Sequence, residues 1–214
     1  MEKIIVLDTE TANSMDDPMV YDVGFAVVDY DSGDVIETYS FAIADVFLDK
    51  EMMNTAYYKE KVPVYWEEIK AGARKLAKLE TVRRILAEVV KKHDIKKIFA
   101  HNARFDYISC TKTRRYMTSS AKRYFYPYGV ELHDSLKLAR EYFKGSAAYD
   151  KFCADNGYLT KRGQNRFTAE ILFRFISGNN EFEEAHRGID DVMIEKEIVM
   201  YCKDPVIDSR LWRD

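Results

Sequence analysis

The stretch IIVLDTE at residues 4–10 is the part of the sequence from which the fold can be inferred. Its first four residues form a continuous apolar run with three β-branched members, which is typical of a strand buried on both faces of a sheet. If the strand continues, Asp8 and Glu10 point to the same face with Cα atoms about 6.5–7 Å apart, since a strand rises about 3.3 Å per residue. Both side chains can then reach one cation at the oxygen distance of about 2.1 Å that Mg²⁺ requires. The alternative for this pair alone is a strand that ends in solvated acids.

Two more strands are predicted in the first part of the chain. They cover residues 20–30 and 35–43, and the turn residues DSGD at 31–34 join them as a hairpin. Residues 49–78 are charged and aromatic, and we expect them to be helical in pieces.

Helices and strands alternate in the rest of the chain. Apolar residues at 82, 85, 86, 89 and 90 repeat at the spacing of one face of an amphipathic helix. A strand over 96–100, a helix from near Phe105 and a strand near 130–132 follow, and then helices over 136–142, 149–156, 168–177 and 189–202. This order predicts an α/β fold: a mixed sheet, with antiparallel hairpin strands first and parallel strands after them, flanked by helices.

The composition fits a single globular domain. The chain has 214 residues, of which 47% are apolar and 32% charged, enough to bury a core. With 33 basic and 36 acidic residues, the overall charge predicts no polyanionic partner, so a nucleic-acid role must come from a local patch. No apolar run approaches the roughly 20 residues of a membrane helix, and the first residues are too soon acidic for a signal peptide. Three cysteines without a CxxC pair argue against a disulfide framework or a zinc site, so we expect a reducing, cytoplasmic location.

Two further acidic segments begin predicted helices. Asp106 ends the segment HNARFD at 101–106, where a strand gives way to a helix, and open α/β sheets bind ligands at such strand ends. The segment HRGIDD at 186–191 opens the last helix. Isoleucines three and seven residues after Asp191 place it on the apolar face of that helix, where a bare charge is costly and needs a positive partner. Asp190 is expected to be its solvated neighbour.

The inference about chemistry depends on these residues acting together. Four acids (Asp8, Glu10, Asp106 and Asp191) and His186 fall at the ends of elements that belong to one sheet edge. Taken one at a time, each acid could simply face solvent or favour a helix N-terminus, and the histidine could be an ordinary loop residue. Carboxylates so close cannot all stay ionised without compensation. Two divalent ions about 4 Å apart would resolve this and clamp the attacking and leaving oxygens of a phosphoryl displacement. A neutral imidazole, with an ordinary pKa near 6.5, could take the proton from the attacking water.

These blocks resemble the motifs of the DnaQ-like (DEDDh) 3′–5′ exonuclease superfamily, whose members include the proofreading epsilon subunit of bacterial DNA polymerase III, RNase T and oligoribonuclease. Residues 8–10 are similar to its D-x-E motif, residues 101–106 to H-N-x-x-F-D and residues 186–191 to H-x-x-x-x-D. The histidine spacing resembles the DEDDh branch, because the sister branch has Tyr where this chain has Arg187. The segment DSLKLAR at 134–140 also looks like the D-T-L-x-L-A-R segment of many members.

The resemblance implies an RNase H-like sheet, two Mg²⁺ or Mn²⁺ ions, and 3′–5′ hydrolysis that releases nucleoside 5′-monophosphates. By motif position, Asp8, Glu10 and Asp191 would hold one ion. Asp8 would bridge to the second ion, and Asp106 would hold that ion directly or through water. His186 would be the general base.

The resemblance also implies how substrate is bound. Thr9 and Thr11 would meet the terminal nucleotide, and Asn102 and Phe105 would support the site. Two departures bear on substrate preference. Many relatives continue the first motif with Thr-Gly, whereas Ala-Asn follows the second threonine here, and the segment 157–184 is longer than the compact family pattern. We therefore expect one exonuclease domain over residues 1–214 with a family-atypical insertion around 157–184.

A basic stretch with interleaved aromatic residues is a candidate for nucleic-acid contact. Within residues 112–128 it has no acids, and its cations and aromatic residues are Lys112, Arg114, Arg115, Tyr116, Lys122, Arg123, Tyr124, Phe125, Tyr126 and Tyr128. Basic side chains can follow a phosphate backbone, and exposed aromatic rings can stack on unpaired bases at ~1–3 kcal/mol each. Lys161, Arg162 and Arg166 are a second candidate. The alternative for both is a solvated charged face with core aromatics.

Three functions remain open. The first is a metal-dependent 3′–5′ exonuclease on single-stranded DNA, with a DNA polymerase or another replication protein as the partner in proofreading or trimming. The second is the same chemistry on RNA or short oligoribonucleotides. Of these two substrates, we favour DNA over RNA. The third is a non-catalytic nucleic-acid-binding module, which predicts that a catalytic group is missing, whereas all five are present. Other enzyme classes have little support, because the glycine-rich phosphate and dinucleotide loops, the G-x-S-x-G elbow and the H-E-x-x-H helix are absent from the sequence.

Overall fold

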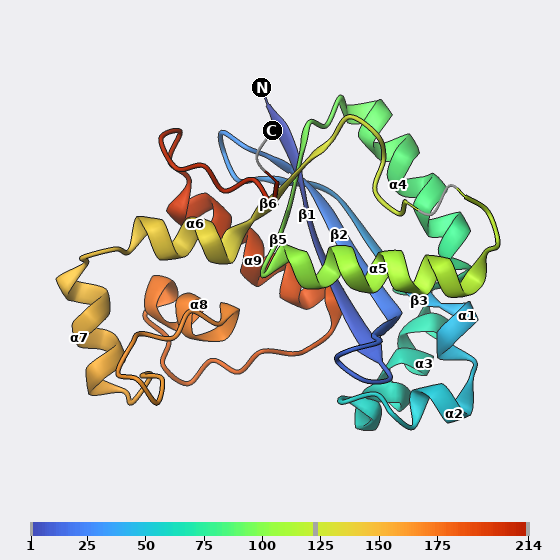
Figure 1. Cartoon of the computed structure of the whole chain (residues 1–214), viewed down its shortest axis with the longest axis horizontal. Helices are drawn as coiled ribbons and strands as arrows, with labels where there is room; N and C mark the ends of the chain where they lie inside the picture. Colours follow the sequence, from blue (N-terminus) through green and yellow to red (C-terminus); the bar gives the residue numbers. More distant parts are fainter. Residues whose placement is uncertain (1, 122–123, 213–214) are drawn as a thin grey trace.

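The computed structural model describes residues 2–121 and 124–212 of the chain. Its centre is a six-stranded mixed sheet with the strand order β4-β3-β2-β1-β5-β6 (Figure 1). The strands are β1 (Lys3–Ala12), β2 (Met19–Asp29), β3 (Val35–Ile43), β4 (Lys75–Ala77), β5 (Lys97–Ala100) and β6 (Glu131–Asp134).

The strand directions place three strand ends at one edge of the sheet. β1, β2 and β3 pair antiparallel in sequence order, whereas β5 lies parallel to β1 and β6 parallel to β5. The carboxyl ends of β1, β5 and β6 therefore meet. The register of β1 against β2 shifts between Glu10 and Thr11, so a bulge in this ladder lies directly after the first acidic motif. Bulges of this kind re-aim side chains next to functional sites.

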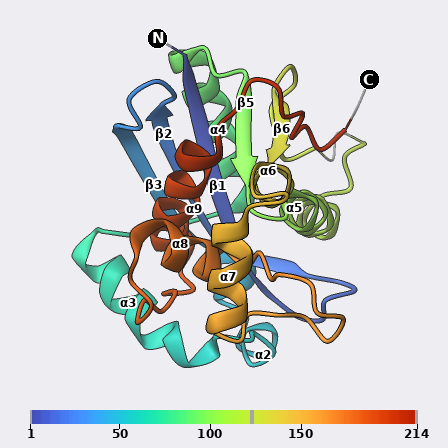
Figure 2. The same ribbon diagram turned by 90° about the vertical axis from the view of Figure 1, so that its left-hand side faces the viewer.

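Helices cover both faces of the sheet. The helical segments described are α1 (Ala44–Phe47), α2 (Lys50–Met53), η1 (Lys59–Lys61), α3 (Val62–Ala71), α4 (Leu79–His93), α5 (Ala103–Met117), α6 (Ser135–Tyr142), α7 (Ala147–Asp155), α8 (Ala169–Ser177) and α9 (Gly188–Cys202). Figure 1 shows α6 to α9 on one side of the sheet and α4 on the other, with α5 crossing in front. In Figure 2, α7, α8 and α9 lie in front of the strands.

The alternation of β1 divides the core into two main clusters. Ile4 and Val6 pack with α6 to α9, whereas Ile5 and Leu7 pack with α4 and α5. All four side chains are fully buried. This arrangement confirms the prediction of a first strand that is covered on both faces.

A close approach of two backbones positions the start of α9 over the sheet. A Cβ atom on Gly24 in β2 would lie 2.3 Å from the carbonyl carbon of Gly188, the first residue of α9. No side chain fits there, so glycine at residue 24 lets the third acidic motif lie against the strands that carry the first.

The segment that follows α9 covers the edge of β6. The N–H of Leu211 donates to the carbonyl of Leu132 over 2.6 Å, and the N–H of Asp134 donates to the carbonyl of Ser209 over 2.8 Å. The edge strand is thus paired by the chain itself, which is one way in which proteins protect a sheet edge.

The predicted mixed α/β fold is confirmed, with antiparallel strands first and parallel strands after them. The strand β4 differs from the prediction of helical pieces over 49–78. Its three residues have no alternating pattern, and the pairing of residues 75–77 with 41–43 of β3 creates the strand. Among the described residues, no helix combines the length and the apolar character needed to cross a membrane.

Candidate active site

The carboxyl ends of β1 and β5 and the first turns of α5 and α9 line a cleft of about 530 Å³. The structure brings together the four acids and the histidine singled out in the sequence, and all of them line this cleft: Asp8, Glu10, Asp106, His186 and Asp191. Three segments that are far apart in the sequence therefore contribute to one site.

Asp8 and Glu10 occupy the last part of β1. The strand alternation puts them on the face of Ile4 and Val6, which is the face covered by α9. Asp8 lies opposite Gly24 of β2 in the ladder, where the partner has no side chain. The two carboxylates are partly buried rather than solvated as the alternative interpretation required.

Asp106 faces the cleft from the first turn of α5. Its side chain is buried, and the hydroxyl of Thr9 donates to its Oδ1 over 2.7 Å. Thr9 is the residue between the two acids of β1, so this hydrogen bond ties the second acidic motif to the first. It also fixes the orientation of the Asp106 carboxylate.

The start of α5 is held by a shared carboxylate. Asn102 adopts the left-handed region (φ 60°), which asparagine tolerates, and its N–H donates to Asp134 Oδ1 over 3.0 Å. The same oxygen accepts the N–H of Leu136 over 3.0 Å and caps α6. Asp134 thus joins the turn after β5 to the turn after β6.

The ring of His101 stabilises the structure of the site through hydrogen bonds. Its two ring nitrogens lie 2.9 Å from Ser135 Oγ and 2.8 Å from the carbonyl of Phe167. Burial lowers the pKa of His101 below its ordinary value. The neutral ring therefore connects β5 to the segment before α8, which forms one wall of the cleft.

Asp191 and His186 are positioned by the N-terminus of α9. Asp191 is 4% exposed, and its Oδ1 accepts the N–H of His186 over 3.2 Å. His186 adopts a positive φ of 49°, and its imidazole stacks on the ring of Tyr58 with centroids 4.2 Å apart. The neighbouring Asp190 is half-buried and pairs with Arg187 over 2.7 Å, so it does not share the environment of Asp191.

The carboxylates of the cleft hold protons more tightly than ordinary acids. Burial, followed by repulsion from neighbouring carboxylates, raises the pKa of Asp8 well above its usual range. Burial is also the first cause for the other three and raises the pKa of Glu10 to about 9, of Asp106 to about 7 and of Asp191 to about 8. Among the described residues, none of these four acids forms a salt bridge with a lysine or an arginine.

The donor set fits divalent cations. One ligand atom each from Glu10, His186 and Asp191 lies within 4.8 Å of the others, the spacing needed to hold one ion. Carboxylate oxygens are the ligands that Mg²⁺ and Mn²⁺ prefer. A concentration of buried carboxylates without a basic partner is stabilised when cations bind, so the residues present suit such ions.

Three residues that sequence reasoning missed belong to the same cleft. Glu195 is 3% exposed, its Oε2 accepts the N–H of His101 over 3.2 Å, and burial followed by Asp106 raises its pKa well above the usual range. Its position one helical turn after Asp191 was a usable signal, because both lie on the inward face of α9. Glu184, whose pKa burial raises to about 7, and Tyr58 come from irregular segments, and no periodic pattern marks them.

The residues expected to meet substrate are placed unequally. Thr9, Asn102 and Phe105 line the cleft. Thr11 follows the bulge of β1 and is not among the described residues that line it.

Two cations also line the cleft. Arg140 of α6 and Arg166 of the segment before α8 are exposed and line it. Neither forms a salt bridge within the part of the chain that the structure describes. Arg166 belongs to the second basic candidate, of which Lys161 and Arg162 are exposed outside the lining residues.

The first basic stretch does not form a continuous cationic face. Arg114 is buried and pairs with Glu80, and the ring of Phe125 is buried in the core. Tyr124 and Tyr128 remain exposed. Lys122 and Arg123 lie outside the described residues.

Comparison with solved structures gives the class of this fold. The chain is similar to the nuclease domain of 3′hExo, a DEDDh family member, bound to rAMP, with a TM-score of 0.64, 8% identity and coverage of 94% of this chain and 90% of that one. It is also similar to a 3′-exonuclease described in recognition of a histone mRNA stem-loop (TM-score 0.62, 8% identity, 94% of this chain and 63% of that one). E. coli Exonuclease I in complex with a dT13 oligonucleotide is a third similar structure (TM-score 0.51, 14% identity, 94% of this chain and 41% of that one).

No family model matches the chain, and no curated protein does. The structural similarity therefore rests on the fold, which is the RNase H-like fold of the DnaQ-like 3′-exonucleases. The predicted resemblance is confirmed at that level.

Proposed function

We propose that this chain is a metal-dependent 3′–5′ exonuclease that hydrolyses terminal phosphodiester bonds of single-stranded nucleic acid. The observation that carries the proposal is the cluster of Asp8, Glu10, Asp106 and Asp191 around one cleft, with His186 beside them. Within residues 2–121 and 124–212, no lysine or arginine forms a salt bridge with these acids. Structural proteins have little reason to bury unpaired carboxylates together, because each costs free energy. The fold shared with 3′-exonucleases supports the same conclusion.

We propose that Asp8, Glu10 and Asp191 hold one ion, with Asp8 and Asp106 at the second. Two Mg²⁺ or Mn²⁺ ions would neutralise these carboxylates, activate a water molecule and bind the scissile phosphate. Thr9 keeps the carboxylate of Asp106 in a fixed orientation through its hydrogen bond.

His186 is proposed as the general base. Burial, followed by Lys61, lowers its pKa, so the imidazole is neutral and able to accept a proton at neutral pH. It would take one proton from the attacking water as the water oxygen bonds to phosphorus. The bond from phosphorus to the 3′ oxygen breaks, that oxygen takes up a proton from solvent, and a nucleoside 5′-monophosphate is released.

The part of the cleft lined by cations is proposed to bind substrate. Arg140 and Arg166 are the cations there, and a guanidinium group can bind a phosphate with two parallel hydrogen bonds. The segment 157–184 contributes Arg166, Phe167 and Glu184 to the lining. We therefore propose that this segment, within a single domain, adjusts substrate preference.

Single-stranded DNA is the substrate we propose, and the complex of Exonuclease I with dT13 supports it. A replication-linked role with a DNA polymerase or another replication protein as partner would follow from a DNA substrate. RNA is the second candidate, because the 3′-exonucleases with similar folds are described with rAMP and with a histone mRNA stem-loop. A non-catalytic module is disfavoured, since every group that the mechanism needs lines the cleft.

The test is hydrolysis of a 5′-labelled single-stranded oligonucleotide with Mg²⁺. A ladder that shortens from the 3′ end is expected, and Asp191→Asn should abolish it. Glu197→Gln is the matched control, because Glu197 lies on the exposed side of α9 and pairs with Lys196. Comparing kcat/KM on matched DNA and RNA strands decides between the two substrates. No shortening of either strand with Mg²⁺ or Mn²⁺ would refute the proposal.

A further inference from the structure

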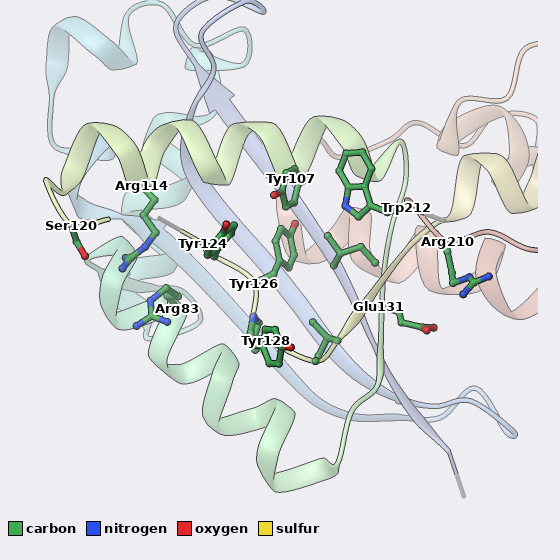
Figure 3. A pocket seen from close by; sticks show the side chains of 14 residues that line it. Arg83, Tyr107, Arg114, Ser120, Tyr124, Tyr126, Tyr128, Glu131, Arg210 and Trp212 are labelled. Atoms are coloured by element: carbon green, nitrogen blue, oxygen red, sulfur yellow. The ribbon is translucent and has the colours of Figure 1, made fainter. Parts of the chain in front are cut away.

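A second hollow lies on the side of α5 that faces away from the acidic cleft. We call it the tyrosine groove. It measures about 1020 Å³ and runs between α5, the end of the segment that leads to β6, and the last residues described. Figure 3 shows Tyr107 and Trp212 at one end, Arg83, Arg114 and Ser120 at the other, and Tyr124, Tyr126 and Tyr128 between them.

Several aromatic rings of the groove are exposed to solvent. Tyr124 is 71% exposed and Trp212 51%, and Tyr128 is fully exposed. Large aromatic side chains gathered around one hollow are uncommon on a surface that contacts only water. These rings come from two segments that are far apart in the sequence, 124–128 and 212, so local sequence alone does not explain their convergence.

The rings are held in place from below. Phe125 is 1% exposed and anchors the segment in the core, next to Cys110 of α5. Tyr107 stacks on Tyr126 with centroids 6.1 Å apart and meets the edge of Trp212 at 5.6 Å. The groove is therefore preorganised, which reduces the entropy lost when a ligand binds.

Guanidinium groups lie at both ends of the groove, Arg83 and Arg114 at one end and Arg210 beyond Trp212 at the other. Arg83 and Arg114 both form salt bridges with the carboxylate of Glu80. The ion pairs hold the side chains of both arginines at the wall of the groove. Aromatic faces beside guanidinium groups are the chemistry that binds single-stranded nucleic acid, in which bases stack and phosphates are attracted.

We propose that the tyrosine groove is a second nucleic-acid subsite, which binds unpaired bases of the strand whose 3′ end is in the acidic cleft. This rests on the proposed function. The helix α5 connects the two sites, because Phe105 and Asp106 line the cleft and the next residue, Tyr107, lines the groove. A strand that passes the N-terminal end of α5 reaches Trp212 before Arg83 and Arg114, which lie at the other end of the groove.

The experiment compares a long and a minimal substrate. The long substrate is a fluorescent dT20 strand, and the minimal one is the p-nitrophenyl ester of thymidine 5′-monophosphate, which can occupy only the cleft. In the variant Tyr124→Ala/Tyr128→Ala, and separately in Trp212→Ala, KM for dT20 should rise at least about tenfold, since alanine substitution removes the stacking of one or two bases. Hydrolysis of the ester should keep its kcat and KM. Tyr116→Ala is the control, because Tyr116 is 65% exposed on α5 and is outside the groove lining.

The outcomes separate the two proposals. If dT20 and the ester are both hydrolysed but the groove variants leave KM for dT20 unchanged, the groove proposal is overturned and the exonuclease proposal stands. Equal losses on both substrates would also overturn it, because they indicate damage to the cleft. If neither substrate is hydrolysed by the unaltered protein, direct binding of dT20 in Ca²⁺ still tests the groove. Unchanged affinity in the variants would then overturn the groove proposal.

Discussion

The ring of Tyr58 lies flat against the imidazole of His186, with centroids 4.2 Å apart and planes inclined by 11°. The ammonium group of Lys61 lies over the ring of Tyr58, 4.9 Å from its centroid, and donates to the carbonyl of Ala185. The segment before α3 thereby fixes the orientation of the residue proposed as general base. The first prediction follows from this contact.

Replacing Tyr58 by alanine should lower kcat about 3–10-fold, because an aromatic stack contributes ~0.5–1.5 kcal/mol and the imidazole loses its preferred plane. Tyr58→Phe keeps the stack and should keep kcat near the original value. Steady-state kinetics on a single-stranded oligonucleotide check both variants. If Phe and Ala reduce kcat equally, the hydroxyl rather than the stack is what matters.

The stability of the metal-free protein should fall as the pH rises. Because the folded state raises the pKa of Asp106 to about 7, of Asp191 to about 8 and of Glu10 to about 9, it holds more protons than the unfolded state between about pH 4 and 9. The free energy of unfolding therefore decreases through that window. Between pH 5.5 and 8 we therefore expect the Tm of the metal-free protein to fall by at least several degrees.

Thermal unfolding in EDTA and in Mg²⁺ tests this prediction. Mg²⁺ should remove most of the decline, since the cation takes the place of the protons. Asp191→Asn should also reduce it. The pKa values of His101 and His186 are lowered, so these residues make the free energy of unfolding rise with pH near pH 6.5. Both histidines are present in the original protein and in Asp191→Asn, so the comparison of the two is unaffected. A metal-free Tm that rises with pH as steeply as the Mg²⁺-bound Tm would contradict the account.

The substitution Glu195→Gln should change the stability of the metal-free protein and its affinity for metal ions in opposite directions. The amide can still accept the N–H of His101 but removes a charge that raises the pKa of Asp8. The metal-free protein should therefore become more stable, whereas its affinity for Mn²⁺ should fall about 3–10-fold. Calorimetric titration with Mn²⁺ and thermal unfolding in EDTA measure the two effects. Glu197→Gln, on the outer face of the same helix, should change neither, and a Glu195 variant that behaves like this control would show that residue 195 is not coupled to the site.

Gly24→Ala should disturb both the fold and the site. The added methyl would lie 2.3 Å from the backbone of Gly188 and push α9 away from the sheet, at a cost of about 1–3 kcal/mol or more. Because His186 and Asp191 lie at the start of that helix, the rate of hydrolysis should fall by a larger factor than the loss of folded protein alone explains. Ser40→Ala is a control from the adjacent strand, since the Ser40 hydroxyl is buried and has no hydrogen-bond partner among the described residues. Urea unfolding and hydrolysis assays compare the two variants, and equal behaviour would argue against the close packing.

Much of the fold could be predicted because the informative patterns are local. The apolar run before Asp8 and the turn at 31–34 each indicate their element without tertiary information. The position of Asp191 on the apolar face of the last helix was likewise readable from its spacing. By contrast, β4 exists only because β3 is beside it.

The residues that escaped prediction are placed by tertiary packing. Tyr58 and Glu184 reach the cleft from irregular segments, and nothing in their sequence context records that they will meet His186. Arg114 shows the opposite case, because the sequence suggested a continuous basic face, whereas this arginine is buried and paired with Glu80 from another helix. Glu195 is different again. Its spacing from Asp191 could have been read, but a glutamate among isoleucines was not recognised as a buried group.

Residues 209–212 pair with the last strand of the sheet and also carry Trp212 to the tyrosine groove. A protease that removes this segment would expose the backbone of Leu132 and Asp134, and an open strand edge favours self-association. The cleaved protein should consequently form oligomers and bind long single strands with lower affinity. Whether this segment is intact is therefore a criterion for the quality of any purified sample.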